Sequence, residues 1–357
     1  MSVLVTSRGI MDSESTRYAR QIQFAPIGQE GQQKIGQATV SILGCGALGT
    51  VAAEILARSG VGHLRIIDRD VVEWTNLQRQ SLFEEQDARD GRSKSDAACQ
   101  RLAKINSEIE LQPIVADVTS GNIDSILMGS DLIIDAADNF LIRFLLNDWS
   151  LKTNTAWVHG GCVGATGQVI LFTGAGSPCF RCLVPEPPPA SSVDTCDTAG
   201  VIGAATHFIA SLQSTEAIKW LSGNQGAVDQ TLLSVDLWNN RIRNLKLSPT
   251  ISKDCVACGR RTYEFLEGSR ALSGESAAVL CGRDAVQISR PSENDIDLLR
   301  YGQRWESVGK VQTTPFFVRL FPDDDHSVTL FRDGRVVITG TSEIAEARTL
   351  CDRYVGG

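Results

Sequence analysis

The chain has 357 residues, of which 42% are hydrophobic and 21% charged, which is ordinary for a globular protein with one large domain or two modest ones. The formal net charge of −8 and the lack of a basic run argue against nucleic acid as a partner. No apolar stretch approaches the ~20 residues of a transmembrane helix, so no membrane association is expected. Residues 1–14 lack the pattern of a signal peptide; we expect a disordered tail there and a cytoplasmic protein.

The first part of the chain alternates expected strands and helices. A short helix at 15–22 precedes strands expected at 38–43, 63–68, 109–116 and 131–138, with helices at 47–60, 92–106 and 140–153. This order predicts an α/β fold, a doubly wound, Rossmann-like and mostly parallel sheet. Further strands are expected at 156–164, 166–173 and within 232–247, with a Pro-rich loop at 184–194 and a long helix at 200–223.

A different pattern begins after residue 262. Strand-like segments at 277–288, 315–321, 327–332 and 335–340 are interspersed with helix-like segments at 293–305 and 342–355. The Asp333-Gly334 pair is typical of a hairpin turn. We therefore expect a first domain at 15–262 and an appended small α+β domain at 263–357, whose role the sequence does not indicate.

The segment SILGCGALG joins the strand expected at 38–43 to the helix expected at 47–60. Gly44, Gly46 and Gly49 match the G-x-G-x-x-G pattern, in which glycine permits a tight turn and brings a phosphate to backbone N–H groups at a helix start. Asp68 ends the next strand, where a carboxylate accepts hydrogen bonds from ribose hydroxyls. These features alone favour NAD over ATP, because the pattern is chiefly a dinucleotide fingerprint.

The residues after Asp68 favour ATP instead. Asn76 and Arg79 follow within one segment, and Lys94 lies near the start of the helix at 92–106. A nicotinamide ring needs an apolar slot, whereas a triphosphate needs cations that neutralise charge at the phosphoryl centre. Each cation alone would pass as a solvated surface residue, but we interpret the set as phosphate-binding.

Asp138 lies at the C-terminal end of the apolar strand expected at 131–138, the edge at which ligands bind in doubly wound sheets. Its carboxylate is a candidate ligand for Mg²⁺ against the phosphates. An N-cap of the following helix is the alternative role for Asp138. Asp135 is the competing candidate in the same strand, unless its side chain is buried away from the site.

Four of the ten cysteines form two C-x-x-C pairs, Cys179 with Cys182 and Cys255 with Cys258. Four thiolates suit a tetrahedral structural Zn²⁺, and two pairs argue against the alternative of a redox C-x-x-C. Cys196 precedes the expected long helix, and a helix N-terminus favours the thiolate; the alternative is an ordinary loop cysteine. The remaining cysteines in the expected sheet region read as small buried apolar residues: Cys45, Cys99 and Cys162.

Together these motifs resemble the ThiF/MoeB family, relatives of the ubiquitin-activating E1 enzymes. The resemblance covers about residues 17–258 and rests on RYARQI, GCGALG, IIDRDVVEWTNLQRQ, GRSKSDAA, DAADN, CFRC, TCDTAGV and CVAC. It implies an adenylyltransferase that uses ATP and Mg²⁺ on the C-terminal glycine carboxylate of a ubiquitin-like sulfur-carrier protein, MoaD- or ThiS-like, and releases pyrophosphate. The sulfur would then serve molybdopterin or thiamine biosynthesis, or tRNA thiolation.

The same resemblance implies roles for individual residues. Arg20, in RYARQ, would reach the ATP of a partner subunit across a homodimer interface, and Cys196 would handle sulfur or accept the acyl group. It also implies that Gly44, Gly46 and Gly49 form the nucleotide loop and that Asp68 binds the ribose. Asn76, Arg79 and Lys94 would act on the phosphates, and Asp138 would hold the magnesium ion. No rhodanese-like loop surrounds Cys281 or Cys351, so a separate sulfur donor, a cysteine desulfurase or rhodanese, is expected.

Three other functions remain as alternatives. An NAD-dependent oxidoreductase on the same fold would leave the two cations and the four paired cysteines unexplained. An inactive E1-like scaffold would not need the full phosphate-binding set, and the zinc pairs and acidic charge weigh against an E1-like tRNA-dehydrating enzyme. The terminal Gly-Gly is the ending of a carrier substrate, but we expect it here to be an ordinary helix end.

Overall fold

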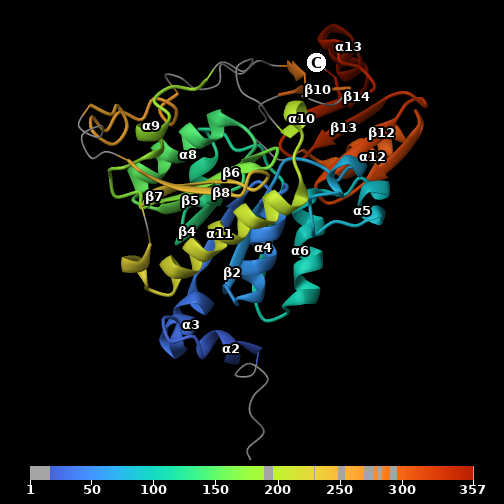
Figure 1. Ribbon diagram of the computed structural model, residues 1–357. Coiled ribbons are helices and arrows are strands. Elements are labelled where there is room, and N and C mark those ends of the chain that lie inside the picture. Colours follow the sequence, from blue (N-terminus) through green and yellow to red (C-terminus); the bar gives the residue numbers. More distant parts are fainter. Residues whose placement is uncertain are drawn as a thin grey trace, which may run out of the picture.

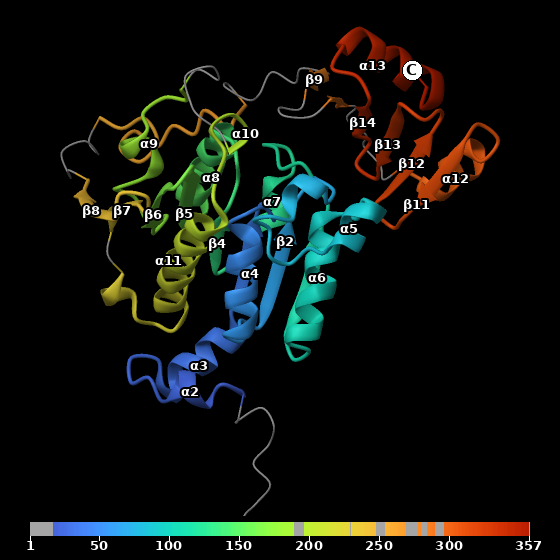
Figure 2. The ribbon, with the colours of Figure 1, turned by 45° about the vertical axis from the view of Figure 1, so that its right-hand side comes forward.

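The structure is a computed structural model that describes residues 17–188, 196–228, 230–247, 254–268, 277–279, 284–289 and 296–356. The expected tail at 1–14, most of the later half of the Pro-rich loop and Cys281 lie outside the described residues. Figures 1 and 2 show two bodies, a large α/β sheet with helices around it and a smaller sheet formed by the C-terminal part.

The large sheet has eight strands in the order β3-β2-β1-β4-β5-β6-β7-β8. The first five pair in parallel and the last three add antiparallel strands, which confirms the expected doubly wound, mostly parallel sheet. The strands are β1 (Thr39–Leu43), β2 (His63–Ile67), β3 (Glu110–Ile114), β4 (Leu132–Asp135), β5 (Ala156–Val163), β6 (Thr166–Phe172), β7 (Thr231–Asp236) and β8 (Arg241–Lys246).

Helices cover both faces of this sheet and create two cores. One core is covered by α4 (Gly49–Arg58), α6 (Lys94–Ile105) and α11 (Gly203–Leu221), and the other by α7 (Ile123–Leu127) and α8 (Phe140–Thr153). The other helices are α2 (Ala19–Ile22), α3 (Gly28–Gln37), η1 (Trp74–Asn76), α5 (Glu85–Asp90), α9 (Phe180–Leu183), α10 (Cys196–Ala199) and η3 (Gln225–Ala227).

The central strands are apolar on both sides because each side faces a helix layer. In β4, Leu132 and Ile134 join the core under α4 and α11, while Ile133 joins the core under α8. Successive side chains of a strand point to opposite faces, so one short apolar run serves both cores. The chain reverses its strand order between β1 and β4, and the crevice at the carboxyl ends of these two strands is where such sheets bind ligands.

Helix α3 was not expected from the sequence, which suggested only a lead into the first strand. The segment is rich in glutamine and glycine and has little apolar periodicity, because Ile35 is its one large apolar residue. Helices α2 and α3 pack beneath the amino ends of the strands, where Tyr18 lies against Gly60 and bonds to Asn106. Figures 1 and 2 place both helices at the end of the sheet opposite to the start of α4.

The C-terminal body is an antiparallel sheet in the order β11-β12-β13-β14-β10-β9, packed by two helices, which confirms the expected small α+β unit. Its elements are β9 (Ala277–Val279), β10 (Ala285–Ile288), α12 (Leu298–Trp305), β11 (Lys310–Thr313), β12 (Phe317–Phe321), β13 (Ser327–Phe331), β14 (Val336–Thr339) and α13 (Ile344–Tyr354). Phe265 and Leu266 still pack on a core of the large sheet, beyond the boundary expected after residue 262.

Candidate active site

The three glycines of the loop after β1 have different reasons to be glycine. Gly44 has a φ of +96°, and a Cβ there would lie 2.6 Å from the carbonyl oxygen of Ala136. A Cβ on Gly49 would overlap the carbonyl of Gly44. Gly46 differs, because the nearest atom to its Cβ would be the Gln80 Nε2, 3.9 Å away. The protein itself therefore needs Gly44 and Gly49, whereas the space beside Gly46 is left open at the start of α4.

Asp68 lies just past the end of β2 and contacts this loop directly. Its carboxylate accepts hydrogen bonds from the backbone N–H of Cys45 and of Asp70, both at 2.7 Å. Burial raises the pKa of Asp68 above its ordinary value, and the Lys94 ammonium opposes that shift. The two donors fix both carboxylate oxygens of Asp68 beside the loop.

Lys94 is the first residue of α6 and is only 5% exposed. Its Nζ lies 3.3 Å from a carboxylate oxygen of Asp70, and its backbone N–H donates to the Asp70 carbonyl at 3.0 Å. Asp68, Asp70 and Lys94 thus form one cluster between β2 and α6, with the lysine buried and the two aspartates half-buried. Asp70 was not singled out from the sequence, although its place two residues after Asp68 was the available signal.

Asn76 and Arg79 lie on and after the turn η1. Asn76 is buried, and its Oδ1 accepts from the Glu73 backbone N–H at 3.0 Å, which holds the turn. Arg79 is half-buried and donates from Nη1 to the Thr75 carbonyl at 2.6 Å. The same turn extends to Gln80, the nearest neighbour of the open position at Gly46. The turn therefore lies over the glycine loop.

Asp138 does not end a strand as expected. Strand β4 stops at Asp135, because the Asp135 carboxylate accepts from the backbone N–H of Ala137 at 3.0 Å and turns the chain. Asp138 lies exposed in the loop that follows, and the N-cap of α8 is Asn139, which accepts from Ile142. The alternative role of Asp138 as N-cap is therefore wrong.

Asp135 anchors a buried network behind this loop. Its carboxylate lies 2.7 Å from His159 Nδ1 and 3.1 Å from Arg143 Nε. Arg143 also donates to the carbonyl of Ala137 at 2.6 Å. Burial alone would raise the pKa of Asp135, but Arg143 and His159 outweigh it and the pKa lies below its ordinary value. The network leaves Asp135 ionised and fixes the backbone that leads to Asp138.

Arg20 lies far from this loop within its own chain. It sits in α2, below the amino ends of the strands, and its Nη1 donates to the Gln23 side chain at 3.1 Å. Figure 2 shows α2 at the opposite end of the sheet from the start of α4. Within one chain, the structure does not bring Arg20 together with the other predicted site residues.

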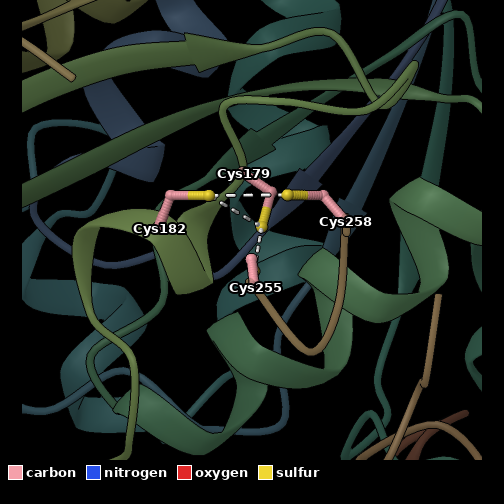
Figure 3. A group of neighbouring side chains, drawn as sticks. All are labelled: Cys179, Cys182, Cys255 and Cys258. Carbon is pink, nitrogen blue, oxygen red and sulfur yellow. Dashed lines mark hydrogen bonds between the residues drawn. The ribbon is translucent and has the colours of Figure 1, made fainter. Parts of the chain in front are cut away.

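The four paired cysteines converge from segments far apart in the sequence (Figure 3). Their sulfurs all lie within 4.8 Å of one another. The distances are 3.9 Å between Cys179 and Cys182, 3.7 Å between Cys179 and Cys255, and 3.4 Å between Cys182 and Cys258. Zn–S bonds of about 2.3 Å at the tetrahedral angle separate sulfurs by about 3.8 Å, whereas a disulfide joins them at about 2.05 Å. The cluster is compatible with a zinc site.

The remaining cysteines predicted from the sequence differ in burial and in position. Cys45 and Cys99 are buried, and burial raises the pKa of Cys99 to about 12, as suits small apolar residues. Cys162 is only half-buried. Cys196 begins the four-residue helix α10 rather than the long helix α11, and the position of its side chain lies outside what the structure describes.

Residues 18–257 match the ThiF family. The chain belongs to the ThiF family. That match ends before the C-terminal sheet begins at Ala277. Family membership favours ATP, whereas the glycine loop and Asp68 taken alone favoured NAD. No helix among the described ranges is both long and apolar enough to cross a membrane.

Two relatives and one solved structure extend this comparison. This ThiF-family chain is 40% identical over 342 residues to the sulfur carrier protein ThiS adenylyltransferase of Bacillus subtilis (strain 168), covering 95% of this chain and 99% of that protein. It is 41% identical over 247 residues to the adenylyltransferase and sulfurtransferase MOCS3 of Culex quinquefasciatus, covering 69% of this chain and 56% of that protein. The crystal structure of E. coli MccB shares the fold, with a TM-score of 0.61 and 24% identity over 70% of this chain and 74% of that one.

Proposed function

We propose that this chain is an adenylyltransferase that activates the C-terminal glycine carboxylate of a ubiquitin-like sulfur-carrier protein. The observation that carries the proposal is the 40% identity to the ThiS adenylyltransferase of Bacillus subtilis, which runs through nearly the full length of both chains. A ThiS-like carrier is therefore favoured over a MoaD-like one, and thiamine over molybdopterin as the pathway. The MOCS3 relative supports the activity but is covered over only 56% of its length.

The geometry of the site suits this reaction. The carrier's carboxylate attacks the α-phosphate of ATP, forms the acyl-phosphate bond and expels pyrophosphate, so two anions must meet. The open position at Gly46 admits the phosphates to the N–H groups at the start of α4, and Asp68 holds the ribose. Arg79 and Lys94 reduce the repulsion and stabilise charge in the transition state, with Asn76 shaping the turn. No general base is needed, because the nucleophile is already ionised.

Two metal ions belong to the proposal. The exposed Asp138 carboxylate would hold Mg²⁺, which neutralises the phosphates of the bound nucleotide. Cys179, Cys182, Cys255 and Cys258 would hold a structural Zn²⁺, a proposal supported by sulfur separations of 3.4–3.9 Å. A reduced four-thiolate site fits a cytoplasmic location.

A homodimer and a separate sulfur donor complete the proposal. The position of Arg20 below the amino ends of the strands supports delivery of its guanidinium to a second subunit's site rather than to its own. A cysteine desulfurase or rhodanese would then supply sulfur to the acyl-adenylate, and Cys196 would take part in that transfer. Attack of the donor's persulfide sulfur on the acyl carbon would release AMP and form an acyl disulfide. Attack of the Cys196 thiolate on the donor-side sulfur of that disulfide would then free the thiocarboxylate and leave Cys196 in a disulfide with the donor.

Mass spectrometry of the intact carrier tests the proposal. The chain is incubated with ATP, Mg²⁺ and a ThiS-like carrier from the same organism, and a carrier without its last glycine serves as the control. We expect the full-length carrier to gain the mass of an adenylyl group and the shortened carrier to gain nothing. An unmodified full-length carrier at saturating ATP would refute the proposed activity.

A further inference from the structure

One row of side chains on the C-terminal sheet faces the large body. Gln312 on β11 lies opposite Arg319 on β12, which lies opposite Thr329 on β13, and the row continues through Val337 on β14 to Gln287 on β10. Cross-strand partners point to the same face of a sheet. Both ends of this row bond to the large body, as the next contacts show.

One end of the row holds the segment that leads to Lys94. Gln312 Nε2 donates to the carbonyl of Asp90 at 2.5 Å, at the end of α5. The Arg319 guanidinium lies against Gly91, where a Cβ would overlap its Nη1. Figures 1 and 2 both show the C-terminal sheet beside α5, just before the start of α6. This contact fixes the turn that places Lys94 at the first position of α6.

The other contacts hold the segment that follows Asp68. Arg335 donates from Nη2 to the carbonyl of Arg69 at 2.9 Å, and its own guanidinium is stacked 3.9 Å from the centre of the Phe331 ring. Arg69 in turn pairs with Asp117 at 3.2 Å, and Gln287 Nε2 reaches the same Asp117 carboxylate at 3.4 Å. The C-terminal sheet therefore holds the backbone next to Asp68 in place.

These polar contacts hold the two bodies together, because the facing surfaces of the C-terminal sheet and the large body are not closely packed between them. A cavity of about 290 Å³ lies between the sheet face and residues 69–73. Arg335 is only 4% exposed and spans this gap to the Arg69 carbonyl. Loss of one such hydrogen bond would leave the two bodies folded but would free the segment that it holds.

We propose that Arg335 and Gln312 are positioning residues for adenylation, and that the C-terminal sheet sets the geometry of the nucleotide site by holding the segments that carry Asp68 and Lys94. This inference rests on the proposed function. It assigns the C-terminal body a role in nucleotide binding rather than in docking the carrier, and it concerns a part of the chain that lies beyond the ThiF match at 18–257.

ATP–pyrophosphate exchange with the full chain and its carrier tests the inference. Arg335→Met keeps the apolar stem over Phe331 and removes the donor, Arg335→Lys restores a donor, and Gln312→Ala removes the second link independently. Arg304→Met is the matched control, because Arg304 is exposed on α12 and stacks on Tyr301 within its own body. The KM for ATP, the KM for the carrier and kcat are measured for each variant.

We expect Arg335→Met and Gln312→Ala each to raise the KM for ATP roughly three- to tenfold, the effect of one lost hydrogen bond, with the carrier's KM nearly unchanged. Gln312→Ala should also lower kcat, because it frees the segment that leads to Lys94. Arg335→Lys should recover most of the ATP affinity, and Arg304→Met should match the unaltered chain. An unchanged KM for ATP, or a rise in the carrier's KM alone, would overturn the inference. If the unaltered chain shows no exchange, the proposed function has failed, and calorimetric ATP affinity of the same variants decides the positioning role separately.

Discussion

At the scale of single residues, Gly46 distinguishes a glycine that we expect a ligand to require from glycines that the fold itself requires. Its missing Cβ faces open space, whereas Gly44 and Gly49 are required by the backbone around them. We expect Gly46→Ala to change the free energy of unfolding by less than about 1 kcal/mol, while its methyl group blocks the phosphates and raises the KM for ATP at least about tenfold. Urea denaturation and exchange kinetics measure the two effects.

Gly49→Ala is the contrasting variant, because its methyl group would overlap the Gly44 carbonyl. It should lower the midpoint of urea denaturation strongly. A Gly46→Ala chain with unaltered ATP kinetics would show that the phosphates do not lie at this loop.

The His159 side chain makes the network behind Asp138 sensitive to pH. Burial lowers the pKa of His159 below its ordinary 6.5, although the bond to Asp135 opposes this, so the folded chain keeps the ring neutral. An unfolded histidine binds a proton below about pH 6.5, so the unfolded state gains protons and stability is lost as the pH falls through that region. Asp135 affects the pH dependence only at lower pH. Its pKa lies below its ordinary 3.8, so its stabilisation is fully present above about pH 3.8 and is lost as the pH falls through the folded-state value.

We therefore expect His159→Gln, which keeps a donor for Asp135, to flatten the dependence of unfolding free energy on pH between about pH 7 and pH 5. Urea denaturation at several pH values measures the slope. An unaltered slope would mean that another group controls the acid sensitivity.

Residues close together in the sequence were the ones that sequence reasoning found. The glycine loop, the acid after β2 and the two C-x-x-C pairs are each recognisable within a few residues. Asp70, Gln80 and the contact of Arg143 with Asp135 were missed, because the importance of these side chains comes from neighbours that only the folded chain supplies. The Asp138 position was misjudged for the same reason, since a side-chain bond of Asp135 ends the strand early.

At the scale of elements, the four-cysteine cluster ties α9 to the segment at 254–258. Tyr263 packs on the cluster, and Phe265 nearby enters the core under α8. If Zn²⁺ is bound, Cys255→Ser removes one of four ligands and should lower the thermal midpoint by several degrees, as should a strong chelator on the unaltered chain. Differential scanning calorimetry measures both.

The chelator should lower the thermal midpoint of the Cys255→Ser chain little further, so this variant is the control for the chelator experiment. A metal analysis of the purified protein should give one zinc ion per chain. Thermal midpoints that respond to neither the substitution nor the chelator would remove the zinc assignment.

Elements with strong apolar periodicity were predicted well, and those held by tertiary contacts were not. Strands β1 and β2 and helices α4, α6 and α8 appear near their expected bounds, because their apolar patterns match the faces that they bury. Helix α3 and the one-turn helices lack such a pattern. They form where neighbouring elements satisfy their polar groups, as Gln32 does by donating to the Ser59 carbonyl at 3.0 Å.

At the scale of the whole molecule, the position of Arg20 predicts that a complete site needs two chains. Arg20→Ala and Lys94→Met should each be inactive as homodimers. When the two variants are mixed and allowed to exchange subunits, each mixed dimer carries one site with both defects and one intact site. We expect exchange activity to return to about a quarter of that of the unaltered protein, since half of the dimers are mixed and half of their sites are intact.

Native mass spectrometry establishes that mixed dimers have formed. Mixed dimers without recovered activity would show that Arg20 does not act across the interface. The sequence alone gave no physical signal for this arrangement, because Arg20 has the features of an ordinary helix-surface residue. The contacts between the C-terminal sheet and the segments next to Asp68 and Lys94 also could not be predicted from the sequence. They join residues more than 200 positions apart, as Gln312 and Asp90 show.

The central claim is that the chain uses ATP to activate a carrier's carboxylate, and ATP–pyrophosphate exchange tests it most directly. Labelled pyrophosphate is incubated with the chain, ATP and Mg²⁺, with each candidate carrier from the same organism in turn. The account predicts carrier-dependent exchange, strongest with a ThiS-like carrier and abolished when the carrier lacks its terminal glycine. No exchange with any carrier at saturating ATP and Mg²⁺ would contradict the account, and measurable binding of NAD would then favour the oxidoreductase alternative.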